Sequence, residues 1–437
     1  MTALIRILLD GIYAEVITKK YFEAGFVSHA AWYTVLLSWA LLILLSIPAF
    51  RAYKNEENRV SREILLMLFL ISVIPFTSMV CFGALSYGFA ALNTVYWLIV
   101  FALILYVRIP NSEKAPLLKA QLGKIADHRI LYAAAILSCL LILYISGRYA
   151  HFRINFRLDN VYALRADAKQ FDLPVVLTYA FSASRNFNPI LLAYFIRRRK
   201  PAWAAMILIA QVFSFGIDGS KSTLFLTVCT AGIGLIPELG LPRINRWMLR
   251  GTAALLIVCM LFYKLIHNVW LVSLFVRRVM YIPVLLSDCY VDFFTNHAPD
   301  FYRQSFLRVF GLQSPYPDIP YMIGDVYQHA VTSANNGLIA DAVTNLGYPG
   351  VVVQPVLLAV VFRLLDRCTR RLDYRIYITA ALYVAFTLTN AFLFTTLLTH
   401  GLLVVMVLLA VMNGAEEREK RCLRAPEQPE SDHAAPG

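Results

Sequence analysis

Basic and aromatic residues alternate in the segment 148–172, which reads RYAHFRINFRLDNVYALRADAKQFD. Guanidinium groups bind phosphate oxygens through paired hydrogen bonds, and aromatic faces stack on sugar rings, so this segment suits a ligand that carries both. A solvated loop that is attracted to lipid headgroups is an equally good interpretation of the segment by itself. The candidate ligand-binding residues here are Arg148, Arg153, Arg157 and Arg165.

Two further basic residues lie in or beside apolar sequence. Arg185 stands inside the apolar segment 173–196, where an arginine in a spanning helix costs at least about 2.5–3.5 kcal/mol and normally faces a cavity or a partner. Lys221 lies in GIDGSKST, which differs from a phosphate-binding P-loop because Ser220 replaces a glycine and no strand precedes it. An ion pair between Asp218 and Lys221 would explain this string. A phosphate held by Lys221 and helix N-terminal amides is the alternative.

Three titratable residues further along the chain could take a proton from a sugar hydroxyl: Asp325, His329 and Asp341. Asp341 and Asn345 are four residues apart, so they would share one face of a helix. Helix capping is the competing explanation, and it is the stronger one for the asparagines and glycines nearby.

The elements that must position these residues are membrane-spanning helices. Of the 437 residues, 59% are hydrophobic and 15% are charged, whereas a soluble domain has about 25% charged residues. A soluble fold is therefore excluded, and apolar blocks near spanning length predict an all-α polytopic membrane protein with about 11 transmembrane helices, in a range of 10–12. The predicted spans are 31–50, 64–82, 86–107, 130–147, 173–196, 202–218, 221–237, 250–270, 349–364, 376–394 and 396–413.

The Lys and Arg residues on alternate loops predict the orientation of these helices. One set of loops holds 24 of them and the other holds 12, so the first set is cytoplasmic by the positive-inside rule. Residues 1–413 then form one membrane domain, residues 414–437 form a disordered cytoplasmic tail, and the loops 148–172 and 271–348 are external. The basic residues of the first external loop lie on the side that the rule depletes, which favours a ligand.

The external loop 271–348 is rich in aromatic residues, so it is expected to be folded or to lie in the membrane interface. Its first part, 272–294, contains Arg277, Arg278 and a proline, which argue against a span and predict a helix along the membrane surface. The segment 3–18 is predicted to be an interfacial amphipathic helix or a partly buried one.

The formal charge of +13 indicates first loops that face anionic lipid and second an anionic ligand. Nucleic acid is disfavoured as a partner, because the basic residues are scattered over many short loops. The seven cysteines include no CxxC pair and no His/Cys cluster occurs, so neither a disulfide framework nor a zinc site is expected. Any catalysis is therefore expected to need no metal and no cofactor.

The architecture and three short strings resemble the O-antigen or oligosaccharide repeat-unit polymerases, Wzy-type, of bacterial inner membranes. The strings are 216–223, 277–283 with the aromatic residues that follow, and 335–350. The resemblance covers most of the chain, while no string is specific by itself.

The resemblance implies metal-independent glycosyl transfer on the periplasmic face. The growing glycan would move from undecaprenyl diphosphate to the next lipid-linked repeat unit, with a chain-length regulator and a flippase as protein partners. Basic groups would neutralise the leaving diphosphate, namely Arg185, Lys221, Arg277 and Arg278. The basic residues of 148–172 would guide the second substrate, with Tyr281 as a further binding residue, and Asp325, His329 or Asp341 would be the base.

Two other functions stay open. An O-antigen ligase uses the same donor but transfers to lipid A-core, and His297 and His329 are compatible with it. A non-enzymatic flippase or transporter of lipid-linked oligosaccharide would keep charges along an intramembrane path on many spans. Here the intramembrane charges are few, notably Arg185 and Lys264, and polar residues concentrate in the two external loops, which favours an external active site.

Overall fold

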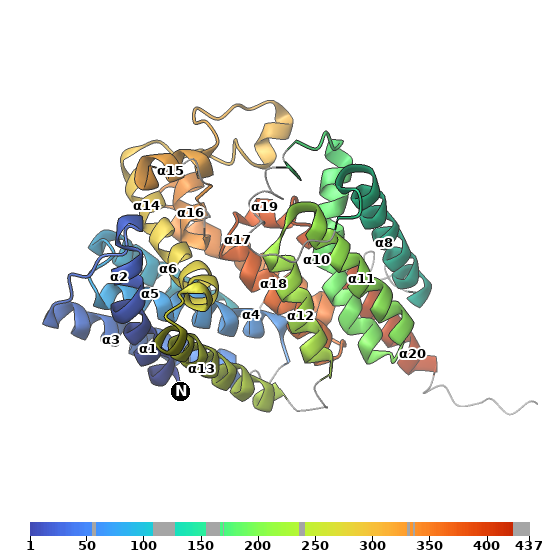
Figure 1. Ribbon diagram of the computed structural model, residues 1–437, viewed down its shortest axis with the longest axis horizontal. Helices are drawn as coiled ribbons and strands as arrows, with labels where there is room; N and C mark the ends of the chain where they lie inside the picture. Colours follow the sequence, from blue (N-terminus) through green and yellow to red (C-terminus); the bar gives the residue numbers. More distant parts are fainter. Residues whose placement is uncertain are drawn as a thin grey trace, which may run out of the picture.

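The computed structural model describes residues 1–54, 58–107, 127–153, 167–168, 170–235, 241–329, 333–334 and 337–422. Over these residues the chain is helical with connecting turns and no strand, as predicted for an all-α fold. The helices form two groups that lie side by side (Figure 1).

The first group combines N-terminal helices with helices from the second half of the chain. It contains α1 (Thr2–Ile12) with its continuations η1 (Tyr13–Ile17) and α2 (Thr18–Lys20), η2 (Phe22–Ala24), α3 (Trp32–Lys54), α4 (Val60–Leu68) with η3 (Phe69–Val73) and α5 (Ile74–Cys81), α6 (Tyr87–Leu105), α13 (Leu241–Ile266), η5 (Val272–Tyr281) with α14 (Ile282–Asn296), η6 (Phe306–Phe310), α15 (Ile319–Gln328) and α16 (Leu338–Leu346).

The second group is built around α10 and contains α8 (His128–Ala150), α10 (Val175–Arg197), α11 (Pro201–Asp218), α12 (Lys221–Leu235), α19 (Leu393–Leu397) and α20 (Leu402–Cys422). α17 (Gly350–Thr369) packs on α6 and α20, and α18 (Tyr374–Leu388) packs on α4, α10 and α12, so both of these helices contact both groups. Figure 1 shows α17 and α18 between the blue and yellow helices of the first group and the green helices of the second.

Within the described residues, six helices are long and apolar enough to cross a membrane: Trp32–Lys54, Val60–Cys81, Tyr87–Leu105, His128–Ala150, Pro201–Asp218 and Ile244–Ile266. The expected count of 11 is therefore not confirmed, although a helix occurs near each predicted span. Two of the others, α12 and α18, have only 15 residues, and α10, α17 and α20 carry charged residues among their apolar ones.

Burial distinguishes the centre of the first group from its lipid-facing surface. The most apolar part of Val60–Cys81 is 89% buried, whereas the corresponding parts of Trp32–Lys54 and Ile244–Ile266 are 28% and 17% buried. Exposed leucine, isoleucine and valine side chains on the last two helices suit a hydrocarbon environment. The chain is thus a helical membrane protein whose peripheral helices present apolar faces.

The N-terminal helix is partly buried, which was one of the two expectations. Ile5, Arg6 and Leu9 face the interior of the first group, where α1 packs on α13 and α5. Arg6 is completely buried. Arg6 and Asp10 of α1 therefore lie on its inner side, whereas Glu15 of η1 is 47% exposed.

The segment 272–294 forms the expected helix, but this helix packs into the first group. It is π-helical over Val272–Tyr281 and α-helical over Ile282–Asn296, and it contacts η3, α5, α13 and α16. Tyr281 and Tyr290 are completely buried. A helix that only rests on a membrane surface would leave one side of such rings exposed, so the expectation of a surface helix requires this correction.

The C-terminal helix continues further than expected. The disordered tail was predicted to begin at residue 414, but α20 extends to Cys422. Its last turns are held by ion pairs to arginines of two other segments, Arg198 with Glu419 at 2.6 Å and Arg371 with Glu417. Charged residues that would favour disorder in isolation thus have partners on α10 and after α17. Residues 423–437 lie outside the described part of the chain.

Candidate functional site

Arg185 and Asp218 form an ion pair between α10 and the end of α11. The Nη1 group of Arg185 donates to the Asp218 carboxylate, and the two side chains are 19% and 24% exposed. The Arg185 guanidinium carbon lies 5.6 Å from the ring centroid of Phe181. Its Nε is buried and has no hydrogen-bond acceptor in the described structure.

The turn between α11 and α12 determines where Asp218 and Lys221 lie. Gly219 has a φ of 63°, a left-handed conformation that ends α11, and Lys221 is the first residue of α12. Asp218 Oδ1 accepts a hydrogen bond from the Ser220 amide at 3.0 Å. α11 and α12 therefore form a tight hairpin, and Asp218, for which the sequence suggested a pair with Lys221, pairs with Arg185.

Arg153, which follows the end of α8, contacts the end of α11 near Asp218. We call the region around Arg153, Arg185 and Asp218 the Arg185 corner. Its Nη1 donates to Asp167 at 2.6 Å and its Nε donates to the Gly216 carbonyl at 3.4 Å. A Cβ at position 216 would overlap the Arg153 carbonyl oxygen, so only glycine allows this approach. Three of the predicted cationic residues, Arg153, Arg185 and Lys221, are therefore brought to one corner.

The backbone around Arg185 is held by contacts with α11 and with the turn at His400 and Gly401. Gln211 Nε2 donates to the Arg185 carbonyl at 2.9 Å. Asn186 Nδ2 and Tyr383 Oη both donate to the His400 carbonyl, at 2.9 and 2.6 Å. Gly401 has a φ of 75°, and a Cβ there would lie 2.8 Å from Ala183. These contacts keep Arg185 in place without using its guanidinium.

A cavity with an empty volume of about 370 Å³ adjoins this corner, and we call it the α12 cavity. It is lined by Asn186, Ser222, Thr223, Phe225, Leu226, Leu382, Tyr383, Phe386 and Thr387. Asn186 and Ser222 follow Arg185 and Lys221 directly in the chain. Arg185 and Lys221 are therefore chain neighbours of lining residues on α10 and α12, and they are not lining residues themselves.

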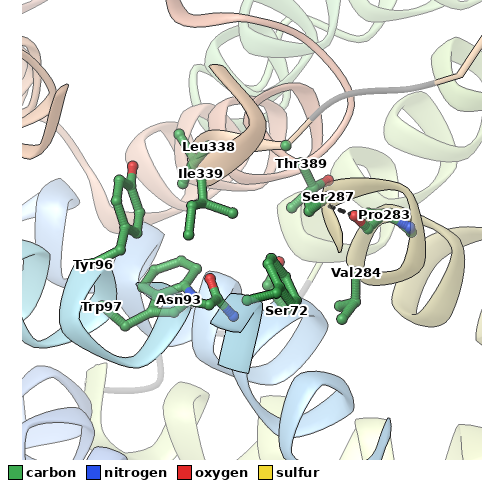
Figure 2. A pocket seen from close by; sticks show the side chains of 12 residues that line it. Ser72, Asn93, Tyr96, Trp97, Pro283, Val284, Ser287, Leu338, Ile339 and Thr389 are labelled. Atoms are coloured by element: carbon green, nitrogen blue, oxygen red, sulfur yellow. Dashed lines mark hydrogen bonds between the residues drawn. The ribbon is translucent and has the colours of Figure 1, made fainter. Parts of the chain in front are cut away.

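A second cavity, which we call the α6 cavity, has an empty volume of about 390 Å³ and lies between α6, η3, α14 and the start of α16 (Figure 2). Its rings come from Phe89, Tyr96 and Trp97, and its polar side chains come from Ser72, Asn93, Ser287 and Thr389. Thr387 lines the first cavity and Thr389 lines the second. Both cavities thus border the C-terminal end of α18.

The predicted pair Arg277 and Arg278 lies on η5. The guanidinium carbon of Arg277 is 4.2 Å from the Tyr21 ring centroid, and its Nε donates to Ser273 Oγ at 3.3 Å. Arg278 is exposed. The Phe275 ring lies 5.9 Å from the Phe225 ring of α12, so η5 is a neighbour of the α12 cavity.

Of the three predicted bases, Asp341 is completely buried. Its carboxylate accepts hydrogen bonds from Asn345 Nδ2 and the Leu393 amide, each at 2.8 Å, and from Gln354 Nε2 at 3.5 Å. Burial raises the pKa of Asp341 to about 6. Its oxygens connect α16, α17 and α19, which is a structural role.

Asp325 and His329 are exposed, on α15 and at its C-terminal end. Both are accessible to a substrate, unlike Asp341. Arg148 is exposed at the end of α8, with its guanidinium carbon 5.7 Å from the Tyr149 ring centroid. The predicted binding residues Arg157 and Arg165 lie outside the described residues.

Tyr281 cannot contact a substrate in this structure, contrary to the sequence-based expectation. It has no exposed surface, its hydroxyl donates to the Leu9 carbonyl at 2.9 Å, and Ser78 Oγ is 3.1 Å away. The aromatic ring holds α1 and α5 against η5. The loop composition around it was a misleading signal, because the residue lies on the inner face of its helix.

An acidic pair on α14 escaped the sequence analysis. The Asp288 carboxylate accepts from the Ser86 amide at 3.0 Å and from Ser86 Oγ at 2.6 Å, while Asp292 accepts from Tyr327 Oη at 2.5 Å. Burial, and to a smaller degree the charge of Asp292, raises the pKa of Asp288. Their spacing of four residues on a predicted helix was the signal that could have identified the pair.

Comparison of the chain with family models, with curated proteins and with solved structures gives no match. Among the described residues, no group of three or more His, Cys, Asp or Glu side chains could hold a metal ion. The site is therefore defined by its own geometry: cationic side chains beside one cavity, and uncharged polar and aromatic side chains around a second.

Proposed function

We propose that the chain polymerises lipid-linked oligosaccharide repeat units of a bacterial surface polysaccharide at the external face of the inner membrane, with its C-terminus in the cytoplasm. It would transfer the growing glycan from undecaprenyl diphosphate to the next lipid-linked unit. The observation that carries the proposal is the position of Arg185, which is anchored by Asp218 and stands with Lys221 beside the α12 cavity.

The charges at this corner suit a diphosphate leaving group. Asp218 fixes the Arg185 guanidinium through Nη1, and a guanidinium held in this way can bind phosphate oxygens. A guanidinium that is already oriented stabilises developing negative charge without reorganising during the reaction. The hydroxyl and amide groups of Asn186, Ser222 and Thr223 add neutral polar contacts along the cavity.

In the proposed reaction, a hydroxyl oxygen of the acceptor sugar attacks the anomeric carbon of the donor glycan. The bond between that carbon and the diphosphate oxygen breaks, and undecaprenyl diphosphate leaves with the electron pair. The hydroxyl proton passes to a base, for which Asp325 and His329 are exposed and Asp341 is not.

The distribution of intramembrane charge supports an external enzyme over a transporter. Arg6 and Arg185 are each paired with a nearby aspartate, at 2.8 Å for Arg6 with Asp10. Charges that are neutralised locally in separate helix groups do not form the continuous polar path that a flippase needs.

The experiment is a gel of surface polysaccharide from a strain in which the gene is deleted, before and after complementation. Polymerase function predicts that the deletion leaves the acceptor core with a single repeat unit and that complementation restores the ladder. A core without any repeat unit would indicate ligation or flipping instead. An unchanged ladder would contradict a role in this glycan.

A further inference from the structure

The α6 cavity contains an asparagine without a partner. Asn93 is 4% exposed, yet no hydrogen bond joins its side chain to the described part of the protein. Figure 2 shows its amide among the lining residues, between Trp97 and Ser72 and facing Ile339. The side chain borders the cavity and has no partner in the described part of the protein, so this position suits a group that can both donate to it and accept from it.

Other polar groups at the cavity wall also have hydrogen-bond donors or acceptors that are not used within the protein. Ser287 Oγ donates to the Pro283 carbonyl at 2.7 Å and retains its acceptor lone pairs. No side chain caps α16 at Gly337, and the first amides of a helix lack partners within the helix. Because Leu338 and Ile339 of that first turn line the cavity, backbone donors accompany the Asn93 amide.

The lining residues of the α6 cavity favour a sugar ring over a phosphate or a lipid chain. All twelve lining residues in the described structure are uncharged, so a phosphate would find no cation there. A lipid chain would leave the Asn93 amide unsatisfied. Hydroxyl groups on a ring both donate and accept, and the apolar face of that ring packs well on aromatic side chains such as Trp97 and Phe89. A neutral sugar ring meets both requirements.

We propose that the α6 cavity binds one uncharged pyranose ring. Its empty volume of about 390 Å³ includes space that is open to solvent. Resting on the proposed function, the ring is the acceptor sugar. The end of α18, through Thr387 and Thr389, separates it from the cavity beside Arg185 and Lys221.

The test is direct binding to the purified full-length chain in lipid nanodiscs. The probes are methyl α- and β-glycosides of glucose, galactose, mannose and N-acetylglucosamine, observed by saturation-transfer NMR, with inorganic pyrophosphate as a separate probe for the Arg185 corner. We expect at least one glycoside to bind the wild type. Asn93→Leu, similar in size but apolar, should weaken that binding at least tenfold and leave pyrophosphate binding unchanged.

Two controls separate binding from folding. Asn296→Leu changes an exposed asparagine at the end of α14 and should bind glycosides like the wild type. Asn93→Ser keeps a hydroxyl and should retain part of the affinity, and neither Asn93 variant should unfold at a lower temperature, because the wild-type amide makes no hydrogen bond.

Failure of this inference differs from failure of the proposed function. If no glycoside binds the wild type, or if Asn93→Leu binds as well as the wild type, the pyranose site is refuted even when the gel ladder shows polymerisation. If glycosides bind through Asn93 but the deletion strain keeps its ladder, the site stands and the polymerase proposal falls.

Discussion

The Nε of Arg6 donates to the carboxylate of Asp10, one helical turn away, over 2.8 Å in the interior of the first helix group. The other two guanidinium nitrogens donate to Thr77 Oγ1 at 3.3 Å and Ser38 Oγ at 3.2 Å. Ser78 Oγ donates to Asp10 at 2.6 Å. The charge is tolerated because each nitrogen has an acceptor, and the network joins α1, α3 and α5.

Removing one member of this pair should be more harmful than removing both. Arg6→Met leaves Asp10 without its cation and should lower the free energy of unfolding by about 3–5 kcal/mol. The double variant Arg6→Met/Asp10→Leu removes both charges and should lose less. Thermal unfolding of the two single variants and the double variant in detergent measures the coupling, and purely additive losses would contradict it.

Arg185→Ala should abolish polymer while the protein remains in the membrane, because the fixed guanidinium beside the α12 cavity is lost. Loss of one oriented donor typically slows such reactions by about 10²–10³-fold. Arg185→Lys keeps the charge but not the planar fork, so it should be intermediate. Arg250→Ala, an exposed arginine beside Trp247 on α13, is the matched control and should leave the ladder intact.

Arg278→Ala tests whether η5 shares this site. Its side chain is exposed, and η5 contacts α12 through Phe275 and Phe225. We expect loss of polymer without loss of protein, as for Arg185→Ala, because the proposed reaction uses this cation to stabilise the leaving diphosphate. The readout is the polysaccharide gel with an immunoblot of the membrane fraction. A normal ladder would restrict the diphosphate site to α10 and α12.

Asp341 should make stability depend on pH. Its pKa is about 6 in the folded chain against an ordinary value of 3.8, so between about pH 4 and 6 the folded protein retains a proton that the unfolded chain releases. The free energy of unfolding should therefore fall as pH rises through this range, by up to about 3 kcal/mol. Asp341→Asn should remove that slope in thermal unfolding measured from pH 4 to 7. An equal slope in both proteins would contradict the assignment.

Gly401→Ala should destabilise the break between α19 and α20. The residue has a φ of 75°, and its Cβ would lie 2.8 Å from Ala183 on α10, next to the Arg185 turn. The combined strain should cost about 1–3 kcal/mol. Gly232→Ala in α12, where a Cβ meets nothing within 4 Å, is the control and should gain about 0.5–1 kcal/mol. Similar melting temperatures for the two variants would contradict the prediction.

The positions of the helices were largely predictable, because charged or polar residues interrupt the apolar runs wherever the chain turns. The predicted span 202–218 corresponds to Pro201–Asp218, and 64–82 corresponds to Val60–Cys81. The last span was misplaced: it was expected over 396–413, but the helix begins at Leu402, because Gly401 adopts a left-handed conformation against Ala183. A local pattern does not reveal a contact with a helix some 200 residues away.

The site was predictable in part. Arg185 was identified because charge within an apolar run is costly, but its partner Asp218 was assigned to Lys221, since pairing across helices depends on how they pack. Tyr281 was expected to bind substrate for a similar reason, because the sequence does not show that its ring is buried between packed helices. Asn93 gave no signal, because one asparagine in an apolar helix looks the same whether it meets a partner or a cavity.

The π-helical turn Phe69–Val73, in the middle of the most buried helix, has a consequence for how this chain can change its length. A π-helical turn contains one more residue than an α-helical turn over the same stretch. Deleting one residue there would let the helix close into regular α form, while Val60–Leu68 and Ile74–Cys81 keep the faces they present. The same deletion in α6 would rotate everything beyond it by about 100° and turn its buried face away. The turn is thus a place where a deletion can be absorbed without reorienting the flanking helices.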